Sequence, residues 1–327
     1  MKKIFFALLL FFSSTIMHFA YAGGGLTHMF IAQEAIALLP DAKLRTLLQN
    51  NMDAYLVGAY YPDSGYVDGN LYGEDSHWDP FIYAFADYIK ETYPDPAAQN
   101  PKLVAFLFGC AAHRVSDEVI HWTFYNVVAE KDFNGDKGTA HSYADEGIDL
   151  LLNVDKYQWF TGPGSWWIPV SDLVAVYHRM GKDQYTADQI NWGVSVISMA
   201  GFGERLISAP AYEYYRWKMP WTADHYYDWP EGGIQMDEQQ VATYQADLWN
   251  RLLGTTSAKM AVKRGHSYPS ESISNTTRLA EQALKNGTAT VSVQKNADGS
   301  VVLGAPVIHK VSAFNDMLQT SIAKMSR

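Results

Sequence analysis

The sequence contains a single cysteine, Cys110, and this scarcity restricts its chemistry. One cysteine forms no intrachain disulfide, and it cannot supply the several thiolates that most structural zinc sites use. Because Cys110 lies inside the apolar run LVAFLFGC, we interpret it as an inert buried thiol. Internal repeats and low-complexity stretches are also lacking. The 327 residues therefore predict one large domain, with or without a small appendage.

Basic residues are in the minority. The net charge is −10, and loss of the N-terminal segment that contains Lys2 and Lys3 would leave 23 basic and 35 acidic residues, or −12. This charge argues against a protein that holds nucleic acid by general electrostatic attraction, so we expect no stable nucleic-acid binding. A metal-dependent nuclease stays open, because its contacts with nucleic acid are brief.

Long hydrophobic runs are restricted to the N-terminus. Lys2 and Lys3 precede the apolar segment IFFALLLFF, and the small-residue sequence AYA ends at Ala22. This order is typical of a secretory signal peptide, so we predict that residues 1–22 are removed and that Gly23 becomes the mature terminus. A membrane anchor is the alternative, but the run is short and no later run is long enough to span a bilayer. We expect an exported bacterial protein, secreted or periplasmic, without a transmembrane segment in its mature form.

Apolar residues recur with helical spacing up to about residue 255, which predicts an all-α body. After this point the segment 290–304 alternates on both sides of the turn signal Asp298-Gly299, and it predicts a β-hairpin. We therefore expect a helical body over 23–255 and a small C-terminal region of mixed structure over 256–327. The predicted helices span roughly 27–39, 43–60, 80–92, 101–129, 141–154, 171–180, 186–207 and 237–252, and loops are expected at 61–78, 159–169 and 219–233.

The stretch AAHRVSDEVIHW places His113, Asp117 and His121 four residues apart. On a helix this spacing stacks the three side chains on one face. Because the preceding run is apolar, that face is predicted to be buried, where imidazole and carboxylate groups must bind one another or a metal. One such pair alone is usually a hydrogen-bonded pair in a protein core.

Further histidines have carboxylates nearby in the sequence. His141 and Asp145 repeat the four-residue spacing, His77 follows an acidic loop that contains Asp63, and His28 lies close to the predicted mature terminus. Together these groups favour a metal centre, and imidazole with carboxylate but no thiolate is typical of catalytic zinc. The histidines without such companions are predicted to be ordinary surface or core residues: His178, His225, His266 and His309.

Five segments in order, GLTHMFIAQEAI, GAYYPDSGY, DSHW, FLFGCAAHRVSDEVIHW and AHSYADEGIDLLL, resemble a known family. This family comprises the zinc-dependent phospholipases C together with the N-terminal domain of GPI-specific phospholipase D. The resemblance covers roughly residues 23–155. It implies an all-helical fold, a cluster of three zinc ions and cleavage of phosphodiesters, commonly in phosphatidylcholine.

The resemblance also implies a set of metal ligands. One zinc would take Asp63, His77, His113 and Asp117, a second His121, His141 and Asp145, and a third His28 with a share of Asp117 and the amino terminus of Gly23. Asp63 is in addition the candidate to orient or deprotonate the attacking water, with a purely structural ligand as the alternative. Bacterial phospholipases C have two more residues between the Asp and second His of the triplet, and Glu in place of Asp145. In these respects the chain looks more like the phospholipase D branch.

The expected function is that of a secreted phospholipase C with two to three zinc ions. It would hydrolyse the glycerol-side phosphodiester of phospholipids such as phosphatidylcholine at a membrane surface. The alternatives are a GPI-type phospholipase D, a single-strand nuclease with the same zinc fold, and a non-catalytic envelope-binding protein. Aromatic residues in the predicted loops would either box a quaternary ammonium group or dock at lipid, although packing is expected for most of them: Trp166, Trp167, Trp221, Tyr226, Tyr227 and Trp229.

Overall fold

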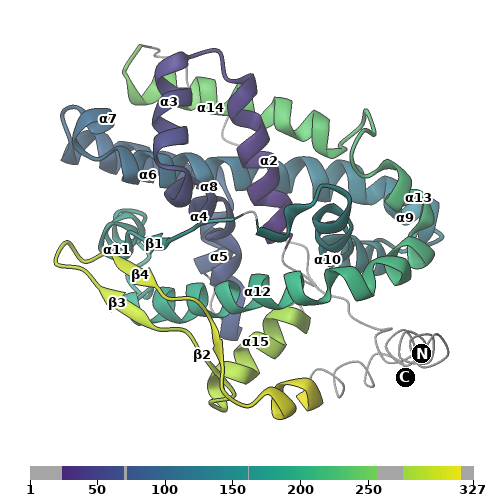
Figure 1. Cartoon of the computed structure of the whole chain (residues 1–327). Helices are drawn as coiled ribbons and strands as arrows, with labels where there is room; N and C mark the ends of the chain where they lie inside the picture. Colours follow the sequence, from purple (N-terminus) through teal and green to yellow (C-terminus); the bar gives the residue numbers. More distant parts are fainter. Residues whose placement is uncertain (1–23, 70–71, 161, 256–274, 318–327) are drawn as a thin grey trace.

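The protein is described by a computed structural model over residues 24–69, 72–160, 162–255 and 275–317. Most of these residues form helices that pack against one another, with short strands on one side (Figure 1), so the predicted all-α fold class is confirmed. The helices are α2 (Gly25–Leu38), α3 (Ala42–Asn50), α4 (Met52–Tyr60), η1 (Pro62–Gly69), α5 (Tyr72–Ser76), α6 (Asp79–Thr92), α7 (Pro96–Gln99), α8 (Pro101–Val119), η2 (Ile120–Phe124), α9 (Tyr125–Asp132), α10 (Lys137–Asp155), η3 (Gln158–Phe160), α11 (Val170–Arg179), α12 (Ala187–Lys218), α13 (Pro220–His225), α14 (Ile234–Leu252) and α15 (Asn275–Lys285).

The crossing of α4 and α8 forms the centre of the molecule, and both helices are buried over most of their length. Gly58 and Gly109 lie at this crossing. A Cβ atom on Gly58 would overlap the carbonyl oxygen of Phe106, and one on Gly109 would overlap that of Tyr55. Because neither glycine carries a side chain, the two backbones approach closely. This approach brings the carbonyl group of Ala59 against α8, which matters for the site described below.

Capping residues fix where the long helices begin. Asn100 accepts a hydrogen bond from the backbone N–H of Leu103 at the start of α8, and Asp136 does the same for α10. Thr186 and Gln189 form a reciprocal capping box at the start of α12. Around the central pair, α2 and α14 pack against each other and against α8, while α10 packs along α12 (Figure 1).

The strands form two small antiparallel sheets. One has the order β1 (Trp166–Ile168), β4 (Val301–Leu303), β3 (Val293–Lys295), and the other pairs β2 (Ala289–Thr290) with β5 (Val307–Ile308). The predicted hairpin is confirmed as β3 and β4, and Gly299 in its turn has φ +80°. A loop was predicted over 159–169, but β1 lies in it, because Ile168 pairs with Val301 of the C-terminal region. The predicted helical body and the predicted C-terminal region thus share a sheet. Their predicted boundary at 255/256 lies next to residues that the structure does not describe.

Three other segments differ from the sequence prediction. The segment 219–233, predicted as a loop, contains α13. The helix predicted over 43–60 is interrupted at Asn51, whose side-chain amide donates to the carbonyl oxygen of Leu47. The glycine- and aspartate-rich segment 61–78, predicted as a loop, contains η1 and α5. These turns are compact because Gly65 and Gly73 meet backbone to backbone, where a Cβ on either residue would overlap the other segment.

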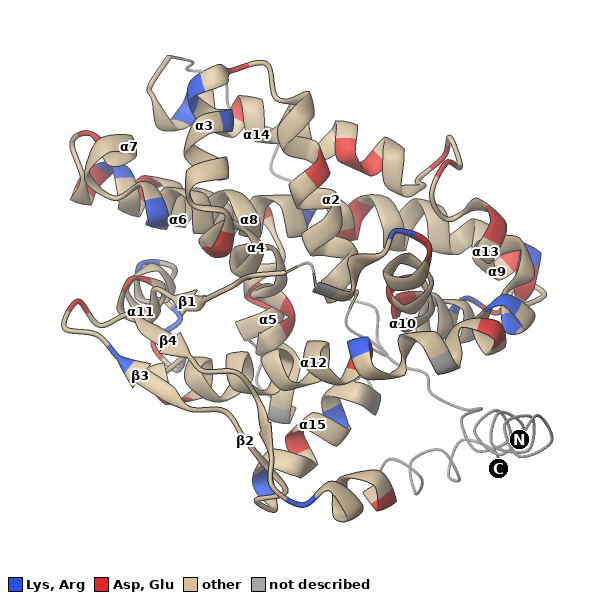
Figure 2. Cartoon of the chain, viewed as in Figure 1, with Lys and Arg blue, Asp and Glu red and all other residues tan. Residues whose placement is uncertain are grey.

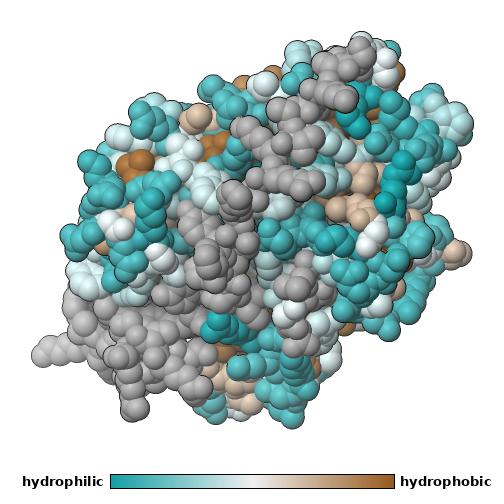
Figure 3. Space-filling view, turned by 180° about the vertical axis from the view of Figure 1, so that it is seen from behind, coloured by the Kyte–Doolittle hydropathy of each residue, from teal (hydrophilic) through white to brown (hydrophobic). Residues whose placement is uncertain are grey.

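The described surface is mostly polar. Lysine and arginine are spread over several outer helices and are not gathered on one face (Figure 2). The face opposite to that of Figure 1 is largely hydrophilic where it is described, with hydrophobic residues in small separate areas (Figure 3). Across the described ranges, every helix is too short or too polar to cross a bilayer.

Replacing Gly109 by Ala should destabilise the protein, because the new methyl group would overlap the Tyr55 carbonyl at the α4–α8 crossing. Overpacking of this kind lowers the free energy of unfolding by about 1–3 kcal/mol. Urea unfolding of the chelator-treated protein measures the change. Gly138→Ala is the matched control, because Gly138 is an exposed helical glycine with only the Asp136 side chain nearby. Equal stability of the two variants would contradict the close-packed crossing.

Candidate metal centre

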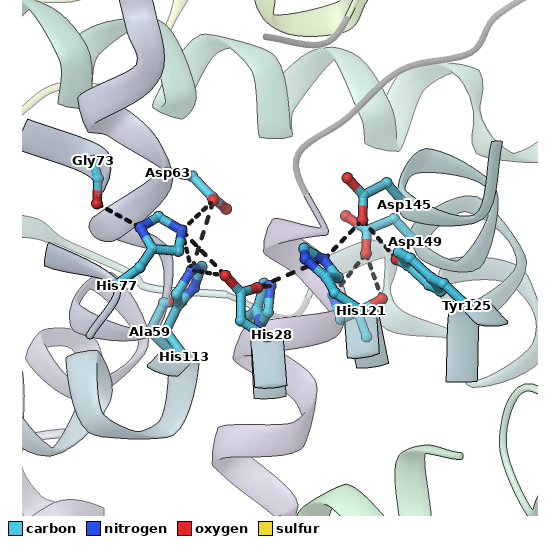
Figure 4. A network of polar contacts seen from close by, with 12 residues as sticks. His28, Ala59, Asp63, Gly73, His77, His113, His121, Tyr125, Asp145 and Asp149 are labelled. Carbon is cyan, nitrogen blue, oxygen red and sulfur yellow. Dashed lines mark hydrogen bonds and ion pairs between the residues drawn. The ribbon is translucent and has the colours of Figure 1, made fainter. Parts of the chain in front are cut away.

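The carboxylate of Asp117 on α8 is the meeting point of four imidazole rings. Its Oδ1 lies 3.3 Å from His28 Nε2 and 3.6 Å from His121 Nε2. Its Oδ2 lies 3.3 Å from His77 Nε2 and 3.7 Å from His113 Nε2. The four rings converge from α2, η2, the end of α5 and α8 itself (Figure 4). The whole Asp117 residue, backbone included, is only 5% exposed, so its charge is compensated by these neighbours and not by solvent.

Backbone carbonyl groups orient two of these rings. His113 Nδ1 lies 2.8 Å from the carbonyl oxygen of Ala59, and His77 Nδ1 lies 2.6 Å from that of Gly73. A carbonyl oxygen only accepts, so each ring carries its proton on Nδ1 when it is neutral. The two Nε2 atoms then present lone pairs to each other at 3.0 Å. Two facing lone pairs repel, and a cation placed between them and the nearby carboxylates would relieve this repulsion.

Asp63 lies on η1, at the most exposed edge of the group. Its Oδ1 is 3.5 Å from His77 Nε2 and 3.6 Å from His113 Nε2. Its Oδ2 is buried and has no hydrogen-bond partner among the described residues. The side chain is 20% exposed, compared with 8% for Asp117. One oxygen thus faces the histidines while the other is available to a further group.

A second group lies one helical turn further along. His121 Nε2 is 3.2 Å from Asp145 Oδ1, and His141 Nδ1 is 3.8 Å from Asp145 Oδ2. Tyr125 donates a hydrogen bond of 2.6 Å to Asp145 Oδ1. Because Oδ1 already accepts from Tyr125, the carboxylate is held in one orientation toward both histidines.

The helix that carries His121 changes its winding at this point. Residues 120–124 form the π-helix η2 between α8 and α9. Single π-helical turns are rare and occur frequently at functional sites. The wider turn places His121 where its Nε2 contacts both Asp117 and Asp145, so the two groups become continuous.

Asp149 anchors the start of α2, which carries His28. Its carboxylate accepts hydrogen bonds from the backbone N–H groups of Leu26 and Thr27, at 3.0 and 2.8 Å, and from the Thr27 hydroxyl. Asp149 lies one turn after Asp145 on α10. The same helix therefore presents Asp145 to the second group and fixes the position of His28 in the first.

Electrostatics keep the carboxylates charged and one buried imidazole neutral. Burial lowers the pKa of His113 to about 3, so its Nε2 lone pair is available at pH 7. Burial alone would raise the pKa of Asp117, but the surrounding imidazoles, His121 first, hold it well below its usual value. The pKa of Asp145 is lowered in the same way against the effect of burial, chiefly by His141 and then His121.

These residues fit zinc. Three groups have ligand atoms within 4.8 Å of one another. Ligand atoms on a zinc tetrahedron with bonds of about 2.0–2.1 Å lie about 3.3 Å apart, close to the spacings found here. A set of imidazole and carboxylate without thiolate is that of catalytic zinc. The three groups are His28, Asp63 and His113; His77, His113 and Asp117; and His121, His141 and Asp145.

The structure brings all eight side chains expected as ligands into one region, while Gly23 lies outside the described residues. The histidines that were predicted to be ordinary surface or core residues lie away from this region, as far as the structure describes them. His178 contacts Asp183 at the surface, His225 stacks on Trp221, and His309 contacts Thr290. His266 falls in a segment that the structure does not describe.

Several of the aromatic residues considered as an ammonium box pack against one another, Trp221 against Trp229 and Tyr226 against Tyr227, and others pack elsewhere. Trp167 meets Phe106, and Trp221 stacks on His225. Tyr226 donates a hydrogen bond to Asp155. Within the described structure these contacts are the ordinary packing that was expected for most of them.

A comparison with known protein families matches residues 27–191, half of the chain, to zinc dependent phospholipase C. This range contains every histidine and aspartate of the site. The chain belongs to the zinc-dependent phospholipase C family. The resemblance seen in the sequence is thereby confirmed, and the zinc in the family's description agrees with the donor set.

Curated relatives in this family are phosphatidylinositol-glycan-specific phospholipases D. The human protein is 30% identical over 243 residues, which are 69% of this chain and 29% of the relative. The *Dictyostelium discoideum* protein is 30% identical over 220 residues, 63% of this chain and 22% of the relative. The chain thus spans less than a third of the length of these relatives. No solved structure matches it.

Sequence reasoning did not find every residue that supports the site. Asp149 extends the spacing of His141 and Asp145 by another four residues, a signal that was present in the sequence. Tyr125 follows His121 by four residues in the same way. Both contacts cross between helices or reach backbone groups, so their roles became visible only in three dimensions.

The purified mature protein should contain two to three zinc ions per chain, because its ligands exceed what one tetrahedral site uses. Elemental analysis after gel filtration measures the number. Chelation should also lower the melting temperature, because the clustered ligands lose their cation. At most one equivalent of zinc, with unchanged melting after chelation, would contradict a multi-zinc centre.

Asp117→Asn should reduce activity more than Asp145→Asn does. Asp117 contacts four histidines through both oxygens, whereas Asp145 contacts two. Turnover of the two variants at saturating zinc compares them, and folding is checked by circular dichroism. Equal losses of turnover in the two folded variants would argue against the sharing of Asp117 between metal positions.

Proposed function

We propose that this protein is an exported zinc-dependent hydrolase of phospholipid phosphodiesters. The observation that carries the proposal is the convergence of His28, His77, His113 and His121 on Asp117, beside the partly exposed Asp63. Its family and its curated relatives, which are phospholipases by name, support the substrate class. The signal-like sequence over 1–22 supports export.

The residues divide into two roles. The histidines, together with Asp63, Asp117 and Asp145, would hold two to three zinc ions, with the amino group of Gly23 as a further ligand. Zinc bound there would polarise the phosphate and lower the pKa of water to about 7. Asp63 would in addition orient and deprotonate the attacking water. Its location at the exposed edge suits a group that meets the substrate.

The finer proposal is cleavage on the glycerol side of phosphatidylcholine. Water attacks phosphorus, the bond from phosphorus to the glycerol oxygen breaks, and that oxygen takes up a proton. The products are diacylglycerol and phosphocholine. This assignment is supported by the family description.

A second candidate is favoured by the relatives themselves. They are named as phospholipases D specific for phosphatidylinositol-glycan, and they match this chain at about 30% identity. In that reaction the bond to the headgroup oxygen breaks and phosphatidic acid is released. The same ligand set serves either reaction, because both are attacks of water on a phosphodiester. The position of the lipid relative to Asp63 decides between them.

Product analysis distinguishes the two reactions. We expect the zinc-loaded protein to release diacylglycerol and phosphocholine from phosphatidylcholine vesicles, measured by mass spectrometry. Phosphatidic acid, with choline or an inositol glycan as the other product, would replace the C-type assignment by the D-type. Asp63→Asn should abolish either reaction; because Asp63 is also a proposed zinc ligand, the zinc content of the variant is measured beside its activity.

Two further outcomes would overturn the proposal. Release of nucleotides from single-stranded DNA without lipid cleavage would identify a nuclease. Zinc binding without hydrolysis of any phosphodiester in the panel would identify a binding protein.

A further inference from the structure

His28 differs from the neighbouring histidines in the surroundings of its second ring nitrogen, Nδ1. Nε2 of His28 faces Asp117, so a metal held between this nitrogen and the carboxylate would leave the proton of the neutral ring on Nδ1. His77 and His113 place their Nδ1 atoms on carbonyl oxygens, whereas Nδ1 of His28 is buried and has no partner among the described residues. Metal-binding histidines almost always donate this second N–H to a carboxylate, a carbonyl or a water. An acceptor for the Nδ1–H of His28 is therefore expected near this ring.

A buried carboxylate without a partner lies nearby. Asp237, on the first turn of α14, is 0% exposed, and neither of its oxygens makes a hydrogen bond of ordinary geometry to a described residue. The Ser116 hydroxyl is likewise buried and unpaired by this criterion. Burial raises the pKa of Asp237, and the charge of His28 and the Ser116 hydroxyl lower it.

The register of the helices explains this proximity. Gln245 of α14 donates to the carbonyl oxygen of Phe108 on α8, at 2.9 Å. Asp237 lies eight residues before Gln245, and Ser116 lies eight residues after Phe108. Arg114 of α8 lies over the ring of Tyr244 while Phe108 lies against Trp249, so the two helices run in opposite directions along their contact. Equal steps of about 12 Å therefore bring Asp237 to the level of Ser116, beside the turn that carries Asp117.

We propose that Asp237 is the positioning residue of the third metal position: its carboxylate accepts the Nδ1–H of His28 through one bridging water, and so fixes the direction of Nε2 toward Asp117. This inference rests on the proposed metal centre. The His28 and Asp237 side chains are not within 4.0 Å of each other, so one buried water joins the donor of His28, the hydroxyl of Ser116 and the acceptors of Asp237. Such a water needs two to four polar partners, and these three groups supply them.

Substitution of Asp237 should weaken one zinc equivalent and spare the others. Loss of a supporting carboxylate typically costs about 10–100-fold in metal affinity, and we expect this loss for Asp237→Ala in chelator competition. Asp237→Asn keeps an acceptor oxygen and should recover part of the affinity. Glu238→Gln is the matched control, because it removes the adjacent acid, whose charged neighbours are Glu34 and Lys156.

A second measurement does not depend on activity. Nitrogen-15 NMR of labelled histidines reports which ring nitrogen carries the proton. In the zinc-loaded protein His28 should show a slowly exchanging, hydrogen-bonded Nδ1–H in the wild type and in Glu238→Gln, and the exchange of this proton should be faster in Asp237→Ala, or in Asp237→Asn if the alanine variant does not fold. Unchanged zinc affinity and an unchanged His28 signal in a folded Asp237 variant would overturn the proposal. If zinc is weakened as expected but no lipid is cleaved, the positioning role stands and the proposed function fails.

Discussion

The burial of one carboxylate, that of Asp117, is the constraint on which the rest of the site depends. A buried charge is costly unless it is compensated, and here the compensation comes from imidazoles on α2, α8 and η2 and at the end of α5. Each of these segments must therefore keep its distance from Asp117 to within a fraction of an ångström. The capped helix starts, the π-helical turn and the anchoring of α2 by Asp149 serve this requirement.

Orientation of the rings depends on packing far from any ligand. The proton of His113 is placed on Nδ1 by the carbonyl group of Ala59, and that group reaches α8 only because Gly58 and Gly109 let the two helices touch. A close helix crossing, which is a property of the core, thus decides which lone pair of a histidine faces the centre. The same holds for Asp237, which is delivered by the register of α14 on α8.

Much of the fold and most of the site follow from local patterns in the sequence. Helical spacing predicted the long helices, and the four-residue steps from His113 to His121 predicted a shared face, because both depend on neighbours within one turn. The break at Asn51 and the turns η1 and α5 were missed, because backbone contacts such as that of Gly65 with Gly73 decide them. Strand β1 was missed for a similar reason, since its partner Val301 lies far along the chain. Asp237 carried no local signal at all: an acid near the start of a helix is usually exposed.

The part of the chain that supports the metal centre is longer than the part that carries its ligands. Every histidine and aspartate of the centre lies within residues 27–191, the range that matches the family. Helix α14 lies outside this range, yet it packs on both α2 and α8, the helices that carry His28 and Asp117. The ligands alone define a chemistry that any phosphodiester can use. Elements beyond the ligand-bearing segment support that geometry, and the edge at Asp63 is where the proposed lipid substrate would present one of its two ester bonds.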